Sequence, residues 1–187
     1  MPNFIQEVEL YKESLNDPSE IKVTEELLYR AKTEDDFFIR IKRSGKVDIA
    51  SGVILFSKEK DKCLFLYHNK IKRWVTPGGH SDGEQDLKKV AFQELEEEVG
   101  IKIDNFMDKK ISFIHKFDYT KETFGYEKSI INIFYTAILP EDQLPKIMEP
   151  SKCSGIDWFS KQKVGELALL YNSTALIKLV DLWDNII

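Results

Sequence analysis

The 187-residue sequence is poor in the residues that build disulfide frameworks and zinc sites. It holds two cysteines, Cys63 and Cys153, and three histidines, all widely separated along the chain. A structural zinc site takes about four such ligands at short spacing, and a disulfide-built domain takes a denser set of cysteines. We therefore expect neither, and we expect Cys63, which lies in an apolar run, to be part of the core.

Long apolar runs and an excess of positive charge are also missing. No run approaches the roughly 20 apolar residues that span a bilayer, and the N-terminus lacks the basic segment and apolar core of a secretory signal. The net charge of −5 disfavours general binding to nucleic acid or to anionic membranes. We therefore expect a cytoplasmic protein that binds neither nucleic acid nor membrane.

Hydrophobic residues make up 42% of the chain, which is enough for one packed domain. Residues 1–38 carry amphipathic helical patterns that are interrupted near Pro18. This indicates an N-terminal helical extension, followed by one domain over residues 39–187. The extension is expected to cover the fold or to form a contact in a homodimer.

Within residues 39–187, apolar runs that predict strands lie on both sides of a central helical run. The expected strands are residues 47–56, 63–68, 111–119, 129–139 and 155–159. A final helical region is expected to start at Ser160 and to break near Asn172. This order predicts an α/β or α+β fold, with a mixed sheet and helices on its faces.

The central helical run, about residues 87–99, carries an unusual group of glutamates. Glu94, Glu97 and Glu98 fall within an arc of about 100° beside the apolar face of the helix. Like charges at this spacing oppose helix formation by a few tenths of a kcal/mol each, on the order of 0.2–0.5. A solvated acidic face is one interpretation; the other is a hard divalent cation such as Mg²⁺, to which the Gly78 carbonyl could add an oxygen.

The stretch from residue 78 to residue 101 resembles the Nudix box, G-x5-E-x7-R-E-U-x-E-E-x-G-U, where U is a bulky aliphatic residue. The positions that match the box are Gly79, Glu94, Leu95, Glu97, Glu98, Gly100 and Ile101. The wording G-G-H-x-D-G-x-x-D-L also resembles a subgroup of MutT-like Nudix proteins. Residues 46–185 are the part of the chain that the resemblance covers.

Two positions depart from the box, because Gln85 stands where it has Glu and Gln93 where it has Arg. In the family these two residues tend to form an ion pair that orients the neighbouring catalytic glutamate. A Gln–Gln amide pair could keep part of that orientation, and Glu84 could supply a displaced carboxylate. The departure is expected to affect the catalytic rate more than the metal binding.

The resemblance implies a Nudix-type α/β/α sandwich around a mixed β-sheet. It also implies hydrolysis of the diphosphate bond in a nucleoside diphosphate linked to another moiety. Mg²⁺ or Mn²⁺ would be held by Glu97, Glu98 and the Gly78 carbonyl, with Glu94 as a further ligand or as the general base. Glu94 and Glu98 are the expected catalytic residues; the alternative function is a catalytically weak nucleotide-binding sensor or regulator of the same fold.

Residues outside the box are expected to bind the substrate, whose identity the sequence does not give. Lys70 and Arg73 lie just before the glycines, where they could meet phosphate oxygens. Phe124 and Tyr126 lie in a polar loop and could stack on a base or ring.

Two further predictions concern single residues near the box or downstream of it. Members of the family often recruit another acid from a later loop, and Glu127 and Glu149 are both candidates. His80, beside the glycines, is expected in a structural or outer-shell role, because oxygen ligands already suit the expected metal.

Overall fold

The computed structural model describes residues 3–40, 45–120 and 125–186. Its central element is a seven-stranded sheet in which strands run in the order β3-β2-β1-β6-β5, while β4 pairs with β1 and β7 with β2. The strands are β1 (Val47–Phe56), β2 (Lys62–His68), β3 (Arg73–Val75), β4 (Gly78–His80), β5 (Ile111–Tyr119), β6 (Lys128–Ile138) and β7 (Cys153–Ser160). β1 and β6 are parallel and the other pairs are antiparallel, so the sheet is mixed.

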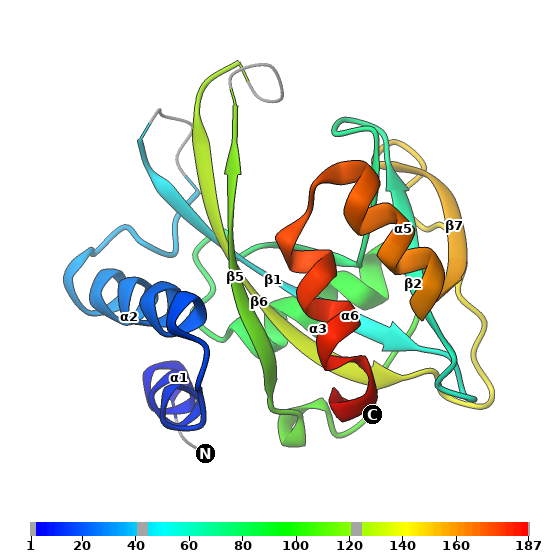
Figure 1. Ribbon diagram of the computed structural model, residues 1–187, viewed down its shortest axis with the longest axis horizontal. Coiled ribbons are helices and arrows are strands. Elements are labelled where there is room, and N and C mark those ends of the chain that lie inside the picture. Colours follow the sequence, from blue (N-terminus) through cyan, green and yellow to red (C-terminus); the bar gives the residue numbers. More distant parts are fainter. Residues whose placement is uncertain (1–2, 41–44, 121–124, 187) are drawn as a thin grey trace.

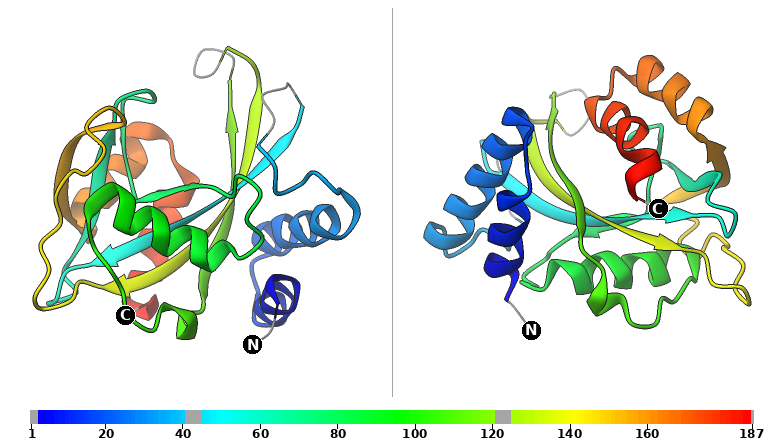
Figure 2. Two further views of the ribbon diagram at one scale, coloured as in Figure 1. Left: turned by 180° about the vertical axis from the view of Figure 1, so that it is seen from behind. Right: turned by 60° about the horizontal axis from the view of Figure 1, so that its bottom comes forward.

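Helices cover both faces of the sheet (Figures 1 and 2). The long central helix, α3 (Leu87–Val99), lies on one face, and the last two helices, α5 (Lys161–Tyr171) and α6 (Thr174–Ile186), lie on the other. Alternate residues of β1 serve the two layers: Val53 packs in the cluster with α3, and Ile54 packs in the cluster with α5 and α6. This confirms the predicted α/β/α sandwich, and a short 3₁₀ turn (Phe106–Asp108) follows α3.

The N-terminal segment forms two helices, α1 (Phe4–Glu13) and α2 (Pro18–Thr33), as predicted. Asn3 caps α1 with a capping box, and Asp17 caps α2, in which Pro18 takes the first helical position. Both helices contact β5, near the edge of the sheet (Figure 1). Val8 of α1 and Leu27 of α2 are fully buried in the same apolar cluster as α3.

Among the described residues, no helix combines the length and the apolar character needed to cross a bilayer. Cys63 and Cys153 are both buried and unpaired, and Cys63 lies in the core as predicted.

Candidate functional site

The helix that carries the glutamates begins and ends as the sequence predicts. The Asp86 side chain accepts a hydrogen bond from the Lys89 amide, 3.0 Å away, at the N-terminus. Gly100 closes the other end with a left-handed φ of 70°, a conformation that costs a glycine little. The apolar face of α3 is buried against the sheet, so the glutamates beside that face lie at the edge of the core.

The glycines before α3 form a short strand, β4. β4 runs antiparallel to β1, with Gly78 opposite Gly52. A Cβ atom on Gly78 would lie 2.6 Å from the Ser51 carbonyl oxygen, and one on Gly52 would lie 2.7 Å from the Pro77 carbonyl oxygen. Only residues without a side chain allow this close approach, and it brings β4 against α3.

The two glycines of β4 each contact a different glutamate of α3. The Gly78 amide donates a hydrogen bond to Glu98 Oε2 over 3.0 Å. Gly79 lies so close to Glu94 that a Cβ atom there would be 2.0 Å from Glu94 Oε1. β4 and α3, which together carry the box, therefore bring the carboxylates of Glu94 and Glu98 next to one another.

Glu149, from the loop between β6 and β7, completes this group. One carboxylate oxygen each from Glu94, Glu98 and Glu149 lie within 4.8 Å of one another. The loop is held to the end of α3, because the Met148 amide donates to the Glu98 carbonyl (2.9 Å) and the Lys146 amide donates to the Val99 carbonyl (3.0 Å). These bonds satisfy carbonyls that a helix end leaves without partners.

Glu127 and Glu149 were the two predicted downstream acids, and the structure places Glu149 beside Glu94 and Glu98. Glu127 is exposed just before β6 and does not belong to this group. Sequence alone could not choose between them, because the choice depends on how the loop packs against the end of α3.

Burial dominates the electrostatics of the group. Glu98 is only 6% exposed, and burial raises its pKa to about 7 although the Gly78 amide opposes this shift. Burial also raises the pKa of Glu94, against the effect of the nearby Lys152. Lys152 Nζ forms an ion pair with Glu149 Oε2 at 2.7 Å.

The donor set of this group fits a hard divalent cation. Mg²⁺ binds oxygen ligands at about 2.1 Å, so two ligands on opposite sides of the ion lie about 4.2 Å apart. The three carboxylates already place their oxygens within 4.8 Å, and they come from two elements that other contacts hold in place.

Glu97, another predicted ligand, lies on the exposed surface of α3. It accepts a hydrogen bond of 2.7 Å from Gln93 Nε2, so Gln93 bonds to Glu97 rather than forming the amide pair with Gln85. Glu84, which could have replaced the glutamate missing at position 85, instead forms an ion pair with Lys89 at 2.7 Å.

The predicted substrate-binding residues lie on other elements. Lys70 is exposed in the turn between β2 and β3, and Arg73, at the start of β3, places its guanidinium 5.2 Å from the centre of the Tyr171 ring. Tyr126 is half-buried just before β6, and Phe124 lies outside the described residues. Their part in binding stays a prediction.

His80 belongs to a buried polar cluster that joins three strands. Lys128 Nζ of β6 lies 2.7 Å from Asp48 Oδ2 of β1 and 3.0 Å from His80 Nε2 of β4. Burial and, after it, the nearby charge of Lys128 lower the pKa of His80 to about 3. A neutral imidazole can accept a hydrogen bond from the ammonium, so this contact links β4 to β6. The structural or outer-shell role of His80 stays a prediction.

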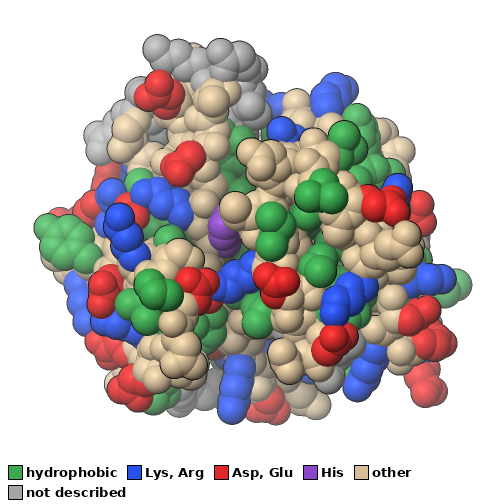
Figure 3. Space-filling model, in the orientation of Figure 1, with side chains coloured by type: hydrophobic (Ala, Val, Ile, Leu, Met, Phe, Trp, Pro, Cys, Tyr) green, Lys and Arg blue, Asp and Glu red, His purple; other side chains and the backbone are tan. Residues whose placement is uncertain are grey.

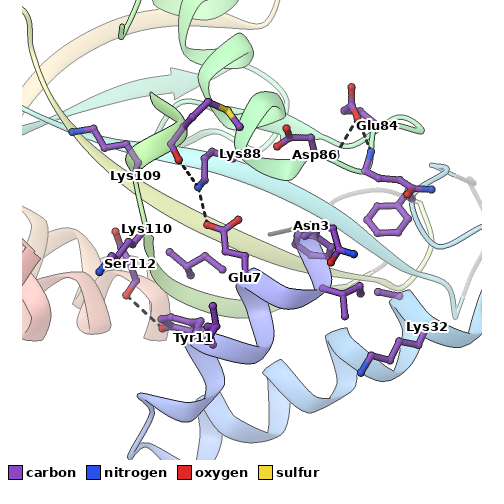
Figure 4. Close-up of a pocket in the computed structure, with 18 of the residues that line it drawn as sticks. Asn3, Glu7, Tyr11, Lys32, Glu84, Asp86, Lys88, Lys109, Lys110 and Ser112 are labelled. Atoms are coloured by element: carbon purple, nitrogen blue, oxygen red, sulfur yellow. Dashed lines mark hydrogen bonds and ion pairs between the residues drawn. The ribbon is translucent and has the colours of Figure 1, made fainter. Parts of the chain in front are cut away.

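A separate cavity of about 1240 Å³ lies between the N-terminal helices and the start of α3 (Figure 4). Glu7 of α1 reaches Lys88 of α3 there, with 3.0 Å between Oε1 and Nζ. Glu94, Glu98 and Glu149 are not among its lining residues.

Figure 3 shows basic and acidic side chains interspersed over the face that carries α5 and α6.

Comparison with known proteins agrees with the box and the fold. The NUDIX domain family matches residues 46–179, which include the whole sheet and α3. The match begins after α1 and α2, so the N-terminal helices lie outside it.

Solved structures share this architecture at low sequence identity. The MutT protein from Methanosarcina mazei Go1 aligns with a TM-score of 0.57 and 18% identity, covering 78% of this chain and 97% of the other. The E. coli dihydroneopterin triphosphate pyrophosphohydrolase aligns with a TM-score of 0.54 and 13% identity, covering 71% and 94%. The C. elegans Ap4A hydrolase gives 0.50 and 20%, covering 71% and 94%.

Proposed function

Because this chain belongs to the NUDIX domain family, we propose that it is a divalent-metal-dependent hydrolase that cleaves the diphosphate bond of a nucleoside diphosphate linked to another moiety. The observation that supports this best is the group formed by Glu94, Glu98 and Glu149 beside the Gly78–Gly79 strand. Two acids of the box and one from a distant loop meet there, although their charges repel.

Glu94, Glu98 and Glu149 would hold Mg²⁺ or Mn²⁺, the cations that such oxygen ligands suit. The cation would supply charge neutralisation for the diphosphate and would make a bound water more acidic. Glu97 and the Gly78 carbonyl, the other predicted ligands, would add further oxygens to the cation.

The two box glutamates differ in a way that suggests separate roles. The Gly78 amide holds Glu98 Oε2, and this hydrogen bond favours the charged form that a ligand needs. Glu94 is less buried than Glu98 and lies directly against Gly79. We assign Glu98 to the cation alone, and Glu94 both to the cation and to the general base that takes the proton of the attacking water.

Lys70, Arg73, Phe124 and Tyr126 are the proposed substrate-binding residues, with the two cations on phosphate oxygens and the two rings on a base. The names of two structural neighbours, a dihydroneopterin triphosphate pyrophosphohydrolase and an Ap4A hydrolase, suggest substrates to assay. ADP-ribose, nucleotide sugars and oxidised nucleoside triphosphates complete the panel.

The test is hydrolysis of this panel with Mg²⁺ or Mn²⁺, measured as phosphate released after a phosphatase step. Glu98→Gln should lower kcat/KM by at least about 100-fold, which is the scale on which a group acting at the reacting centre matters. Glu96→Gln, an exposed glutamate of the same helix, is the matched control and should leave the rate unchanged. Near-full turnover by a folded Glu98→Gln variant would reject the proposed site.

A second candidate function is a nucleotide-binding sensor or regulator that hydrolyses slowly. Gln93 bonds to Glu97 and Glu84 pairs with Lys89, so the ion pair that orients the catalytic glutamate in the family is replaced by other contacts. Tight nucleotide binding without metal-dependent turnover on any member of the panel would favour this candidate.

A further inference from the structure

Lys152 forms an ion pair with one carboxylate of the proposed metal site, that of Glu149. It follows Glu149 by three residues, and its Nζ lies 2.7 Å from Glu149 Oε2. Its backbone is fixed on both sides, because its amide donates to the Glu149 carbonyl (3.0 Å) and its carbonyl accepts from the Asn69 amide (2.8 Å). Its side chain is 48% exposed, so the ammonium can leave the carboxylate without disturbing the loop.

Lys152 interacts with the whole group of carboxylates and not only with its ion-pair partner. Its positive charge favours the ionised forms of Glu94 and Glu98, and all three glutamates favour the charged form of Lys152. One ammonium therefore offsets part of the repulsion among three carboxylates that lie within 4.8 Å.

A divalent cation bound to Glu149 would share that carboxylate with Lys152, whose Nζ lies 2.7 Å from Oε2. The oxygen of Glu149 that pairs with Lys152 is buried, and a second positive charge beside it would be repelled by the ammonium. The cation and the ammonium are thus alternative partners for the group.

We infer that Lys152 is an exchangeable counter-ion of the metal site: it stabilises the three carboxylates in the metal-free protein and competes with the divalent cation for Glu149. This inference rests on the proposed function, since it takes the carboxylate group to be a metal site. Its consequence is that Lys152 weakens metal binding, in contrast to the ligands, which strengthen it.

The experiment compares Mn²⁺ binding to chelator-treated wild type and Lys152→Gln by calorimetry, without nucleotide. Removing the competing charge should lower the Kd for Mn²⁺ about three- to tenfold, the scale of a partly exposed charge acting on a doubly charged ion. Lys152→Arg keeps the charge and should bind like wild type. Lys163→Gln is the matched control, because Lys163 is also half-exposed (49%) and also pairs with a glutamate three residues away.

Thermal unfolding gives an independent readout. Without metal, Lys152→Gln should melt at a lower temperature than wild type, because its carboxylates lose their counter-ion; saturating Mn²⁺ should remove this difference. Equal Mn²⁺ affinity of wild type and Lys152→Gln would overturn the inference and leave the metal site intact. Absence of Mn²⁺ uptake by wild type would overturn both.

Discussion

At the scale of single residues, the site depends on how closely Gly79 approaches Glu94. A Cβ atom at Gly79 would lie 2.0 Å from Glu94 Oε1, and real side chains do not approach that closely. The missing side chain therefore lets the Glu94 carboxylate lie against Gly79, so the arrangement of the proposed metal ligands depends on this glycine.

Gly79→Ala should push the Glu94 carboxylate away from Glu98 and weaken Mn²⁺ binding at least about tenfold, since ligand geometry decides the affinity of such sites. Calorimetry with Mn²⁺ measures the effect. Gly165→Ala is the control: a Cβ there meets nothing within 4 Å, and in a helix the change should be neutral or stabilising by up to about 1 kcal/mol. Unchanged Mn²⁺ affinity in Gly79→Ala would show that the contact does not position Glu94.

His80 should make the free energy of unfolding depend on pH. Its pKa is lowered to about 3 in the folded protein, so below the ordinary value of 6.5 the unfolded chain binds a proton that the folded protein excludes. The stabilisation is complete above pH 6.5 and is lost as the pH falls, by up to about 1.4 kcal/mol per pH unit for one proton.

His80→Gln, which keeps an acceptor for Lys128, should flatten this dependence between pH 7 and pH 5.5. Denaturant unfolding at several pH values measures it. Identical slopes for variant and wild type would mean that His80 is protonated as readily in the folded chain as in the unfolded one.

Site residues could be predicted from the sequence where their partners lie close to them along the chain. Glu94 and Glu98 were recognisable because helical spacing and the box relate them to nearby glycines. Glu149 was one of two candidates, and Lys152 had no signal, because both reach the site through a loop packed on the end of α3. A contact between residues about 50 positions apart leaves no pattern in the sequence around either of them.

At the scale of elements, α2 is tied to both the sheet and the last helix. Glu20 is 4% exposed and accepts a hydrogen bond from the Ile114 amide of β5, 2.7 Å away. Lys178 of α6 forms ion pairs with Glu20 and with Asp17. Three elements that are far apart in the sequence thus meet at one buried carboxylate.

Lys178→Met should lower the free energy of unfolding by about 2 to 3 kcal/mol, because it leaves Glu20 buried without its cation. The measurement is denaturant unfolding at pH 7. Lys161→Met is the control, since Lys161 pairs with the exposed Asp184 and such surface pairs contribute at most about 1 kcal/mol. Equal losses in the two variants would contradict a special role of the Glu20 contact.

Most elements were predictable because their patterns are long. The helices from α1 to α3 and strands β1, β2, β5, β6 and β7 follow apolar periodicity and caps. β3 and β4 were not predicted, since three residues are too few for a pattern, and β4 forms only because Gly52 and Gly78 let two backbones approach.

At the scale of the whole molecule, the N-terminal helices share the core of the sandwich. Val8, Leu27 and Phe37 are fully buried in the cluster that also contains α3. The family match nevertheless starts only at residue 46. The division into an extension (1–38) and a Nudix domain (39–187), the homodimer and the cytoplasmic location stay proposals.

The central claim is that Glu94, Glu98 and Glu149 together hold one divalent cation. Calorimetric titration of the chelator-treated protein with Mn²⁺ tests it most directly, with Glu149→Gln and Glu97→Gln side by side. We expect uptake by wild type, at least tenfold weaker binding in Glu149→Gln because an ion ligand is lost, and a smaller loss in Glu97→Gln, whose carboxylate lies outside the group. Mn²⁺ binding to Glu149→Gln as tight as to wild type would contradict the account.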